Sequence, residues 1–289
     1  MLLGKKVLSD QKGQTLLVIV LVMVVALTVG LSIATRTIVN LRTTSDQANS
    51  QKALSAAEAG VEESIKTGSS IAKTNFPIAS GVNVSYTTNV NPVDGTVKFL
   101  LNGGTQISQH DAVYVWVTPY MNNFSTTWSG HLTVYWGDAS ASTNCNVYSP
   151  PSPYNPTPAI EVAVVYGSKT TPNIQRYAFD PCGAPRTTSN HFDSSGITTG
   201  SNKICTGDNC QTLKYSRTID LTTTPVLLVR VNPIYTDSYI GAQGDNNLPG
   251  QGSIIDSTGT TDQSTRKISV YEGYPEIPSE FFPVSFWQR

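Results

Sequence analysis

The stretch TLLVIVLVMVVALTVGLSIA, residues 15–34, decides how this chain is organised. It contains 20 residues without a charge, and its only polar side chains are Thr15, Thr28 and Ser32. At 1.5 Å per residue a helix of this length spans roughly 30 Å, about the hydrocarbon thickness of a bilayer. Because every backbone group must be paired within a segment that crosses lipid, the stretch is predicted to be a transmembrane helix despite its many valines.

The charges that flank this span predict its orientation. Lys5, Lys6 and Lys12 precede it, and Arg36 and Arg42 follow it. The positive-inside rule therefore favours a cytoplasmic N-terminus and an exported C-terminal part in a single-pass membrane protein. A cleaved secretory signal is the alternative, but such signals have a shorter apolar region followed by a small-x-small site, and no clear Ala-x-Ala follows this one.

The apolar pattern continues beyond the span at three- and four-residue steps, the period of an α-helix. These positions are Leu31, Ala34, Ile38 and Leu41, and then Leu54, Ala57, Val61 and Ile65, with a polar stretch at 43–52 between the two groups. Gly68 is a candidate C-cap. A helix over residues 15–66 would be roughly 78 Å long, which no globular core requires. We expect it to pack against copies of itself or partner chains, with the face of Leu54, Ala57 and Val61 buried against the rest of the protein.

Two motifs lie near the two ends of this helix. They are Lys-Gly-Gln-Thr-Leu-Leu at 12–17 and Ser-Ala-Ala-Glu-Ala-Gly-Val-Glu at 55–62. With the apolar run they resemble the N-terminal region of type IV pilins, and they are most similar to the PilX-type minor pilins over roughly residues 1–67. The resemblance implies cleavage by a prepilin peptidase after Gly13, which leaves Gln14 as a methylated first residue. It also implies that the partners are the inner membrane, other pilin subunits and the pilus assembly machinery. Residues 1–13 would be a cytoplasmic leader, and residues 14–67 the membrane and assembly helix, which carries Val18, Leu31, Ile38, Leu54, Ala57, Glu58 and Val61.

Val18 departs from the family pattern. Major pilins carry a glutamate at the fifth mature position, where it pairs with the N-terminal amine of a neighbouring subunit, and the fifth mature position here is Val18. A buried carboxylate is costly unless it is paired, so its absence changes the energetics of docking between subunits. The resemblance therefore implies a minor, low-copy or tip-proximal subunit.

Residues 71–289 have the composition of an exported β-rich domain. They contain 12 Lys plus Arg and 15 Asp plus Glu, a balance that gives no basic footprint for nucleic acid. Thr, Ser, Asn, Gly, Pro, Val and Tyr dominate, and about 220 residues are enough for one sizeable domain or two small ones. The predicted fold class is α+β, a long transmembrane and stalk helix followed by an antiparallel, β-sandwich-like exported domain.

Nine segments of this domain are predicted to be strands. They are 82–90, 96–101, 112–119, 131–136, 159–166, 174–180, 213–219, 226–232 and 265–271. Asp94-Gly95 predicts a hairpin with a type I′ turn. Residues 149–158 contain five prolines and residues 241–252 are rich in glycine, so both are predicted to be loops. The apolar end, Pro283 to Trp287, is expected to fold back onto the domain or to pack beside the stalk.

The four cysteines are Cys145, Cys182, Cys205 and Cys210, and all lie in the predicted exported part, where disulfides are stable. Three pairings are possible. Cys205–Cys210, closing a tight loop, together with Cys145–Cys182 is favoured. A zinc site is the competing interpretation, but the spacing is not C-x₂-C and no histidine is close to the pair.

No motif for catalysis, a cofactor or a metal is found in the sequence. The chain has three histidines, His110, His131 and His191. His131 is expected at a strand edge and His110 in a turn. Asp208-Asn209 and Asp245-Asn246-Asn247 carry oxygen ligands suited to calcium, but such clusters are more often plain turns. The chain is therefore not expected to be an enzyme or to carry a cofactor or metal.

Five aromatic residues cluster within 21 positions: Trp116, Tyr120, Trp128, Tyr135 and Trp136. Core packing is expected for most of them, and an exposed patch would instead bind a surface glycan or a protein ligand.

The predicted function is a non-catalytic minor subunit of a type IV pilus-like surface filament, with a role in assembly or adhesion. A surface adhesin held by an uncleaved signal anchor and an anchored glycan hydrolase are the alternatives.

Overall fold

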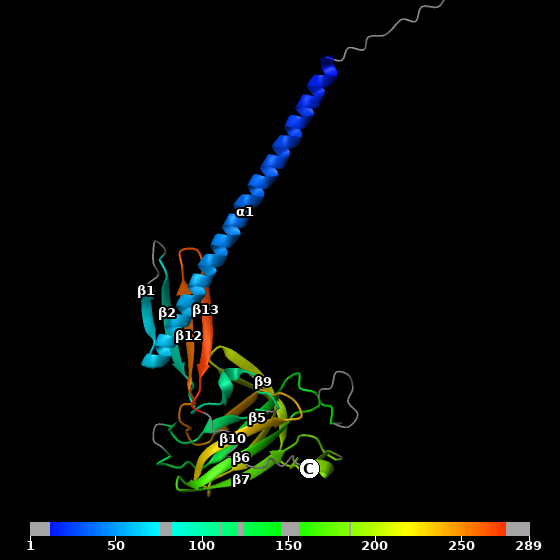
Figure 1. The fold of residues 1–289 in the computed structure, drawn as a ribbon. Coiled ribbons are helices and arrows are strands. Elements are labelled where there is room, and N and C mark those ends of the chain that lie inside the picture. Colours follow the sequence, from blue (N-terminus) through cyan, green and yellow to red (C-terminus); the bar gives the residue numbers. More distant parts are fainter. Residues whose placement is uncertain are drawn as a thin grey trace, which may run out of the picture.

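The structure is a computed structural model that describes residues 12–75, 83–109, 111–120, 124–145, 156–184 and 186–275. One long helix leads into a domain of antiparallel strands, as expected for an α+β chain. The helix projects far beyond the strands, and only its last part lies against them (Figure 1).

The helix α1 (Lys12–Thr67) is a single unbroken element of 56 residues, about 84 Å long at 1.5 Å per residue. It ends at Gly68, which has φ +64° and donates its backbone N–H to the Ser64 carbonyl oxygen at 2.8 Å. A residue with a Cβ adopts this left-handed conformation only with strain, so the glycine stops the helix, as predicted.

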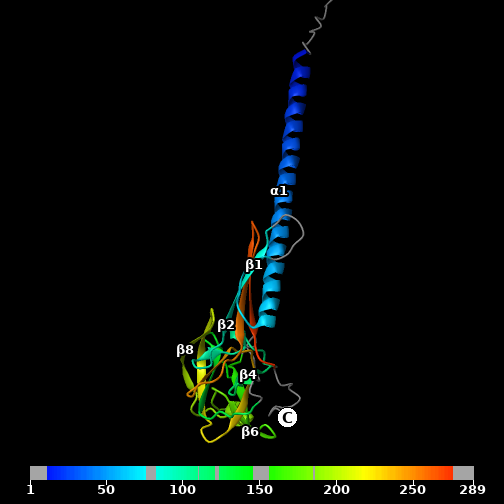
Figure 2. The same cartoon turned by 90° about the vertical axis from the view of Figure 1, so that its left-hand side faces the viewer.

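The last part of α1 lies on a four-stranded antiparallel sheet, seen edge-on in Figure 2. Its strand order is β1-β2-β12-β13. The strands are β1 (Ile71–Asn75), β2 (Ser85–Pro92), β12 (Ser253–Thr260) and β13 (Thr265–Glu272). We call α1 and this sheet the helix–sheet unit.

The remaining strands form a larger body of two antiparallel sheets. One sheet has the order β4-β10-β6-β7 and the other β3-β11-β5-β9-β8. The first contains β4 (Val113–Trp116), β10 (Val226–Ile234), β6 (Ala159–Ser168) and β7 (Thr171–Phe179). The second contains β3 (Phe99–Leu100), β11 (Ile240–Gly244), β5 (His131–Asp138), β9 (Asn209–Asp220) and β8 (Thr198–Thr206), and the short helices are η1 (Asn102–Gly104) and α2 (Arg186–Asn190). Both sheets contribute side chains to one hydrophobic cluster, among them Val162, Val229, Val134 and Trp136.

The body is an insertion between two neighbouring strands of the helix–sheet unit. Strands β2 and β12 are paired from Pro92↔Ser253 to Ser85↔Thr260. The chain therefore leaves the small sheet at Pro92, builds the whole body and returns at Ser253, directly opposite its point of departure. The body lies at the end of the sheet that is far from the free part of α1 (Figure 1).

All nine predicted strand segments contain strand residues, but four strands were not predicted. These are β1, β8, β11 and β12. Strands β8 and β12 are rich in Ser, Thr and Gly, so their local strand preference is weak. Pairing overrides this preference: β8 pairs with the neighbouring β9, and β12 pairs with β13 and with β2, which is distant in sequence. The predicted loop at 241–252 is wrong for 241–244, which belong to β11.

The predicted hairpin at Asp94-Gly95 is also wrong, because β2 and β3 belong to different sheets. Asp94 instead accepts hydrogen bonds from the backbone N–H and the hydroxyl of Thr96, both at 2.8 Å, and the backbone bond to Thr96 lowers the pKa of Asp94. Gly95 is required by close packing, since a Cβ there would lie 2.7 Å from the Leu248 carbonyl oxygen. Of the predicted loop at 149–158 only 156–158 are described, without regular structure, and His110 and the segment 283–287 lie outside the described residues.

Candidate functional site

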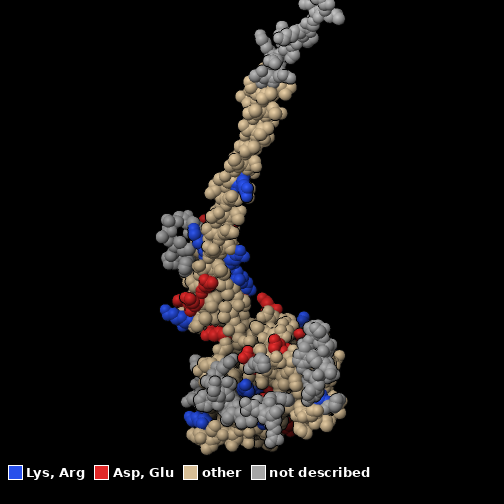
Figure 3. Space-filling model, turned by 45° about the vertical axis from the view of Figure 1, so that its right-hand side comes forward, with Lys and Arg blue, Asp and Glu red and all other residues tan. Residues whose placement is uncertain are grey.

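The first part of α1 is an apolar rod that no other described residue covers. From Leu16 to Leu41 its large apolar side chains are exposed, and no charged residue occurs between residue 16 and Arg36. Figure 3 shows the same bare, uncharged surface on the upper part of the helix. By length and composition alone this part of α1 is able to cross a membrane.

The residues predicted for assembly divide between this rod and the docked end of the helix. Val18, Leu31 and Ile38 lie on the rod and are exposed. Gly13 and Gln14 lie in the first turn of α1, and only their helical backbone is described.

The docked end faces the sheet with small side chains. The buried positions recur at helical spacing and are Ala53, Ala56, Ala57, Gly60, Val61 and Ser64. Burial of Ala57 and Val61 was predicted correctly. Leu54 was predicted to be buried, yet it is 40% exposed, and Glu58 is exposed beside it. The helix is rotated so that its smallest side chains meet the strands, because a leucine at this surface would hold the two backbones apart.

Two glycines permit this close approach. A Cβ on Gly60 would lie 2.5 Å from Ser257 Oγ and 2.9 Å from Thr88 Cγ2. A Cβ on Gly259, in β12, would overlap the Ala53 carbonyl oxygen and lie 2.7 Å from the Ala57 nitrogen. The α1 backbone therefore rests directly on the backbone of β12.

Polar groups complete this interface. Ser64 Oγ and Thr88 Oγ1 are 2.6 Å apart in a buried position, and Thr88 Oγ1 also accepts the backbone N–H of Ile71 at 2.9 Å. Higher on α1, Asn49 donates to Gln263 at 3.1 Å, and Arg266 Nε donates to Ser50 Oγ at 2.8 Å. The polar stretch 43–52 thus includes residues that contact β13 and the turn before it.

Replacing Val61 with aspartate should destabilise the helix–sheet unit by about 2–4 kcal/mol, because it buries an unpaired charge against the strands. Leu54→Asp is the matched control, since it places the same charge on an exposed position of the same helix. Denaturation followed by circular dichroism measures both. Equal losses of stability would contradict the observed orientation of α1.

The body contains both favoured disulfides, Cys145–Cys182 and Cys205–Cys210. Their sulfurs are oxidised, which removes the thiolates that a zinc site would need. Within the described ranges, no group of three or more His, Cys, Asp or Glu side chains is arranged to hold a metal ion.

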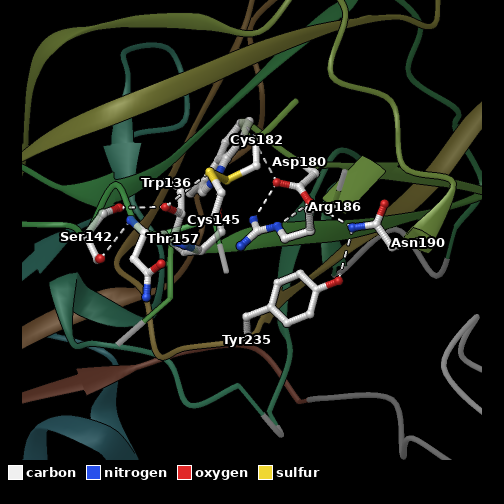
Figure 4. Close-up of a disulfide and its surroundings, with 11 residues drawn as sticks. Trp136, Ser142, Cys145, Thr157, Asp180, Cys182, Arg186, Asn190 and Tyr235 are labelled. Atoms are coloured by element: carbon white, nitrogen blue, oxygen red, sulfur yellow. Dashed lines mark hydrogen bonds and ion pairs between the residues drawn. A yellow bond between two sulfur atoms is a disulfide. The ribbon is translucent and has the colours of Figure 1, made fainter. Parts of the chain in front are cut away.

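A buried polar cluster adjoins the first disulfide (Figure 4). The Asp180 carboxylate accepts hydrogen bonds from Arg186 Nε at 2.7 Å, Asn190 Nδ2 at 2.7 Å and the Cys182 backbone N–H at 2.9 Å, and it also pairs with Arg186 Nη2. The Arg186 guanidinium lies over the Tyr235 ring, 4.5 Å from its centre. No sequence motif identifies this cluster, which joins α2 to the strands of the body.

The second disulfide closes the β8–β9 hairpin, whose end contacts other elements. Thr206 Oγ1 accepts the Leu100 backbone N–H at 2.7 Å, and Asn209 Nδ2 donates to the Gly103 carbonyl at 2.8 Å. Asp208 is 3.9 Å from Lys267 Nζ on β13. The end of this hairpin therefore lies where the body meets the helix–sheet unit.

Gln251 stabilises the segment through which the chain passes from the body back to the small sheet. Its buried side chain accepts the Trp116 backbone N–H at 2.9 Å and donates to the Trp116 carbonyl at 2.7 Å, as a neighbouring strand would. Its backbone N–H donates to Val93 O at 3.0 Å, and Tyr271 Oη donates to its carbonyl at 2.6 Å. Residues 245–252, predicted to be a plain loop, thus form part of the joint between the two units.

His131 lies at the surface between two carboxylates. Its Nδ1 is 2.6 Å from Asp245 Oδ2, its Nε2 is 3.8 Å from Asp220 Oδ1, and its backbone N–H donates to Asp245 Oδ1 at 2.8 Å. The hydrogen bond with Asp245 raises the pKa of His131. Burial alone would raise the pKa of Asp245, but its hydrogen bonds with His131 and Asn246 outweigh burial and lower that pKa. Both Asp245 oxygens are engaged, which fits the turn interpretation of Asp245-Asn246-Asn247.

The contact between His131 and Asp245 should depend on pH. Because the folded pKa of His131 lies above its ordinary value of 6.5, the stabilisation is fully present below about pH 6.5 and is lost as the pH rises through the folded pKa. Because the pKa of Asp245 is lowered, the carboxylate loses its contribution only as the pH falls below about 3.8. A nuclear magnetic resonance titration should show the raised His131 pKa, and Asp245→Asn should return it toward 6.5 while Asp208→Asn leaves it unchanged. An identical His131 pKa in the Asp245→Asn variant would contradict the arrangement.

The aromatic cluster is mainly core, as expected. Trp116, Trp128, Tyr135 and Trp136 are buried, and only Tyr120, at 40%, is exposed. Trp136 donates its indole N–H to the Pro158 carbonyl at 3.1 Å.

No protein-family model matches this chain, and no curated protein and no solved structure was found to match it.

Proposed function

We propose that this protein is a membrane-anchored, non-catalytic minor subunit of a type IV pilus-like surface filament. The observation that carries the proposal is the division of α1. One continuous helix has an uncovered apolar part and an end that is docked on a sheet through small side chains.

An apolar rod of this length is unstable in water. Each Å² of apolar surface removed from water contributes about 25 cal/mol, and a contiguous exposed patch of this size marks a membrane or protein contact. In the proposal the rod spans the inner membrane before assembly, with the N-terminus in the cytoplasm, and packs among the helices of other subunits afterwards. Val18 is part of this rod, so the chain has no docking carboxylate at that position. This favours a low-copy or tip-proximal position in the filament.

The body is the part displayed outside the cell. Its insertion between β2 and β12 supports this, because the chain returns beside its point of departure and leaves the docked helix undisturbed. The hydrophobic cluster shared by its two sheets supports a sandwich-like packing. We propose that the body serves adhesion or assembly through a surface glycan or a protein ligand. The hydrogen bonds of its polar clusters support a non-catalytic role. The Asp180 carboxylate is hydrogen-bonded to Arg186 and the Asp245 carboxylate to His131, so both serve to hold the fold together.

The state of the N-terminus tests the proposal. Mass spectrometry of the surface protein should show a mature chain that begins at a methylated Gln14, after removal of residues 1–13 by a prepilin peptidase. Gly13→Val should block this cut, and Gly30→Ala, whose Cβ would meet open space, should be processed normally. An intact Met1 on assembled protein would favour the signal-anchored adhesin instead.

Stoichiometry tests the minor role separately. Purified filaments should contain this chain at a small fraction of the main subunit. Filaments composed mainly of this chain would contradict the low-copy assignment that rests on Val18.

A further inference from the structure

The sheet β4-β10-β6-β7 has a second face, which points away from the shared hydrophobic cluster. Strand pairing places residues of this face in rows across the four strands. One row consists of Trp116, Leu228, Val165 and Ile174, with one residue from each strand. We call this surface the outer face.

Much of the outer face is buried. An antiparallel sheet with one face on a core normally carries exposed polar side chains on the other. Here Trp116, Leu228 and Ala163 are buried on the outer face, and so is Glu161. Burial fades toward β7, where Ile174 is 42% exposed. At the β4 side, described side chains cover part of Trp116: Phe124 stacks on its ring at 5.8 Å and Tyr120 meets it edge-on at 5.2 Å. We expect a segment that covers the rest of the face to enter beside them.

The chain that follows β13 arrives at that side. The Tyr274 ring lies 5.5 Å from the Trp116 ring in an edge-on contact and stacks on Tyr120 at 5.1 Å. Beyond Pro275 the sequence continues for 14 residues, with Phe281, Phe282, Val284, Phe286 and Trp287 among them. At about 3.3 Å per residue this segment reaches up to about 46 Å, whereas four strands at about 4.8 Å spacing are only about 14 Å wide.

The charges of the face and of the segment are complementary. The outer face carries Arg230 and Arg176, with Arg176 bonded to Glu161 Oε1 at 2.6 Å. The segment carries Glu276 and Glu280 against a single cation, Arg289. Glu161 Oε2 is buried, and no hydrogen-bond donor among the described residues reaches it. A hydroxyl or indole N–H from the segment, such as those of Ser285 and Trp287, would satisfy this oxygen.

We propose that residues 276–289 of the same chain pack on the outer face of the β4-β10-β6-β7 sheet. The segment follows β13 of the helix–sheet unit, and the outer face belongs to the body. The packed segment would therefore connect the two units. The inference is independent of the pilus proposal, since it concerns packing within one chain.

Hydroxyl-radical oxidation, read residue by residue by mass spectrometry, tests this packing on the full chain in detergent. Trp287 should be oxidised several-fold more slowly in the folded chain than in the same chain unfolded in guanidinium. Val165→Glu, on the outer face, should abolish most of that protection. Val97→Glu, at an exposed position outside this sheet, is the matched control and should leave it intact.

Each remaining outcome overturns the proposal. Equal oxidation of Trp287 in folded and unfolded chains shows that the segment does not pack. Protection that survives Val165→Glu places the segment elsewhere, on the stalk helix or in detergent. Protection that grows with protein concentration assigns it to a second copy. Oxidation of the core residue Trp136 reports whether Val165→Glu itself unfolds the body. In that event Ile174→Glu, at an exposed position of the same face, replaces it and should also abolish most of the protection.

Discussion

Replacing Gly259 with alanine should lower the free energy of unfolding of the helix–sheet unit by about 2–3 kcal/mol, through overpacking of a close contact. The added methyl group would overlap the Ala53 carbonyl oxygen and crowd the Ala57 nitrogen, and both are backbone atoms of α1 that have no rotamer to change. The helix must therefore lift from β12 and weaken the burial of Ala56 and Val61.

The sign of this change in stability distinguishes a close backbone contact from an ordinary glycine position. Glycine-to-alanine changes in compatible backbone conformations normally stabilise a protein by about 0.4–1 kcal/mol through the unfolded state. Gly250→Ala is the matched control, because its Cβ would meet its nearest neighbour, the Val93 carbonyl oxygen, at an ordinary 3.7 Å. Denaturation of both variants, with α1 followed by circular dichroism, should separate them. A Gly259→Ala protein as stable as Gly250→Ala would show that α1 does not rest on β12.

Replacing Asp180 with alanine should cost the body about 3–5 kcal/mol, the usual loss when one partner of a buried ion pair is removed. The change leaves the buried Arg186 guanidinium without its carboxylate and removes the acceptor of the Asn190 and Cys182 N–H groups. The Tyr235 ring remains beneath Arg186, but a cation–π contact does not replace a carboxylate.

Asp208→Ala is the matched control for this prediction. Asp208 also faces a cation, Lys267 at 3.9 Å, but its side chain is almost fully exposed, and such surface pairs contribute about 0–1 kcal/mol. Unfolding of both variants in denaturant, with the disulfides intact, measures the difference. Similar losses would mean that the cluster around Asp180 is solvated rather than buried.

The proposed function assigns different roles to the docked helix and to the body. Gly259 tests the docking of the assembly helix, and Asp180 tests the body that the helix would display. Because the body is inserted between β2 and β12, damage at Asp180 should leave the contacts between α1 and the small sheet largely in place.

Much of the architecture follows from local patterns in the sequence. The length of the uncharged run at 15–34, the helical spacing that follows it and the stop at Gly68 predict α1, because helices depend on neighbouring residues. The tight Cys205–Cys210 loop is likewise a local feature. Strands with strong alternation, such as β5 with Leu132, Val134 and Trp136 on the core side, were also recognisable.

Tertiary structure alone decided the rest. The spacing of Leu54, Ala57 and Val61 predicts an apolar face but not which flank of the helix meets the sheet, and the backbone contact at Gly259 selected the small side chains instead of Leu54. The insertion of the body and the strands β11 and β12 join residues that are distant in sequence, and the cluster of Asp180 and Arg186 has no local motif. The physical reason is that periodicity and caps act over a few residues, whereas sheet pairing and the burial of charge are settled only when remote segments meet.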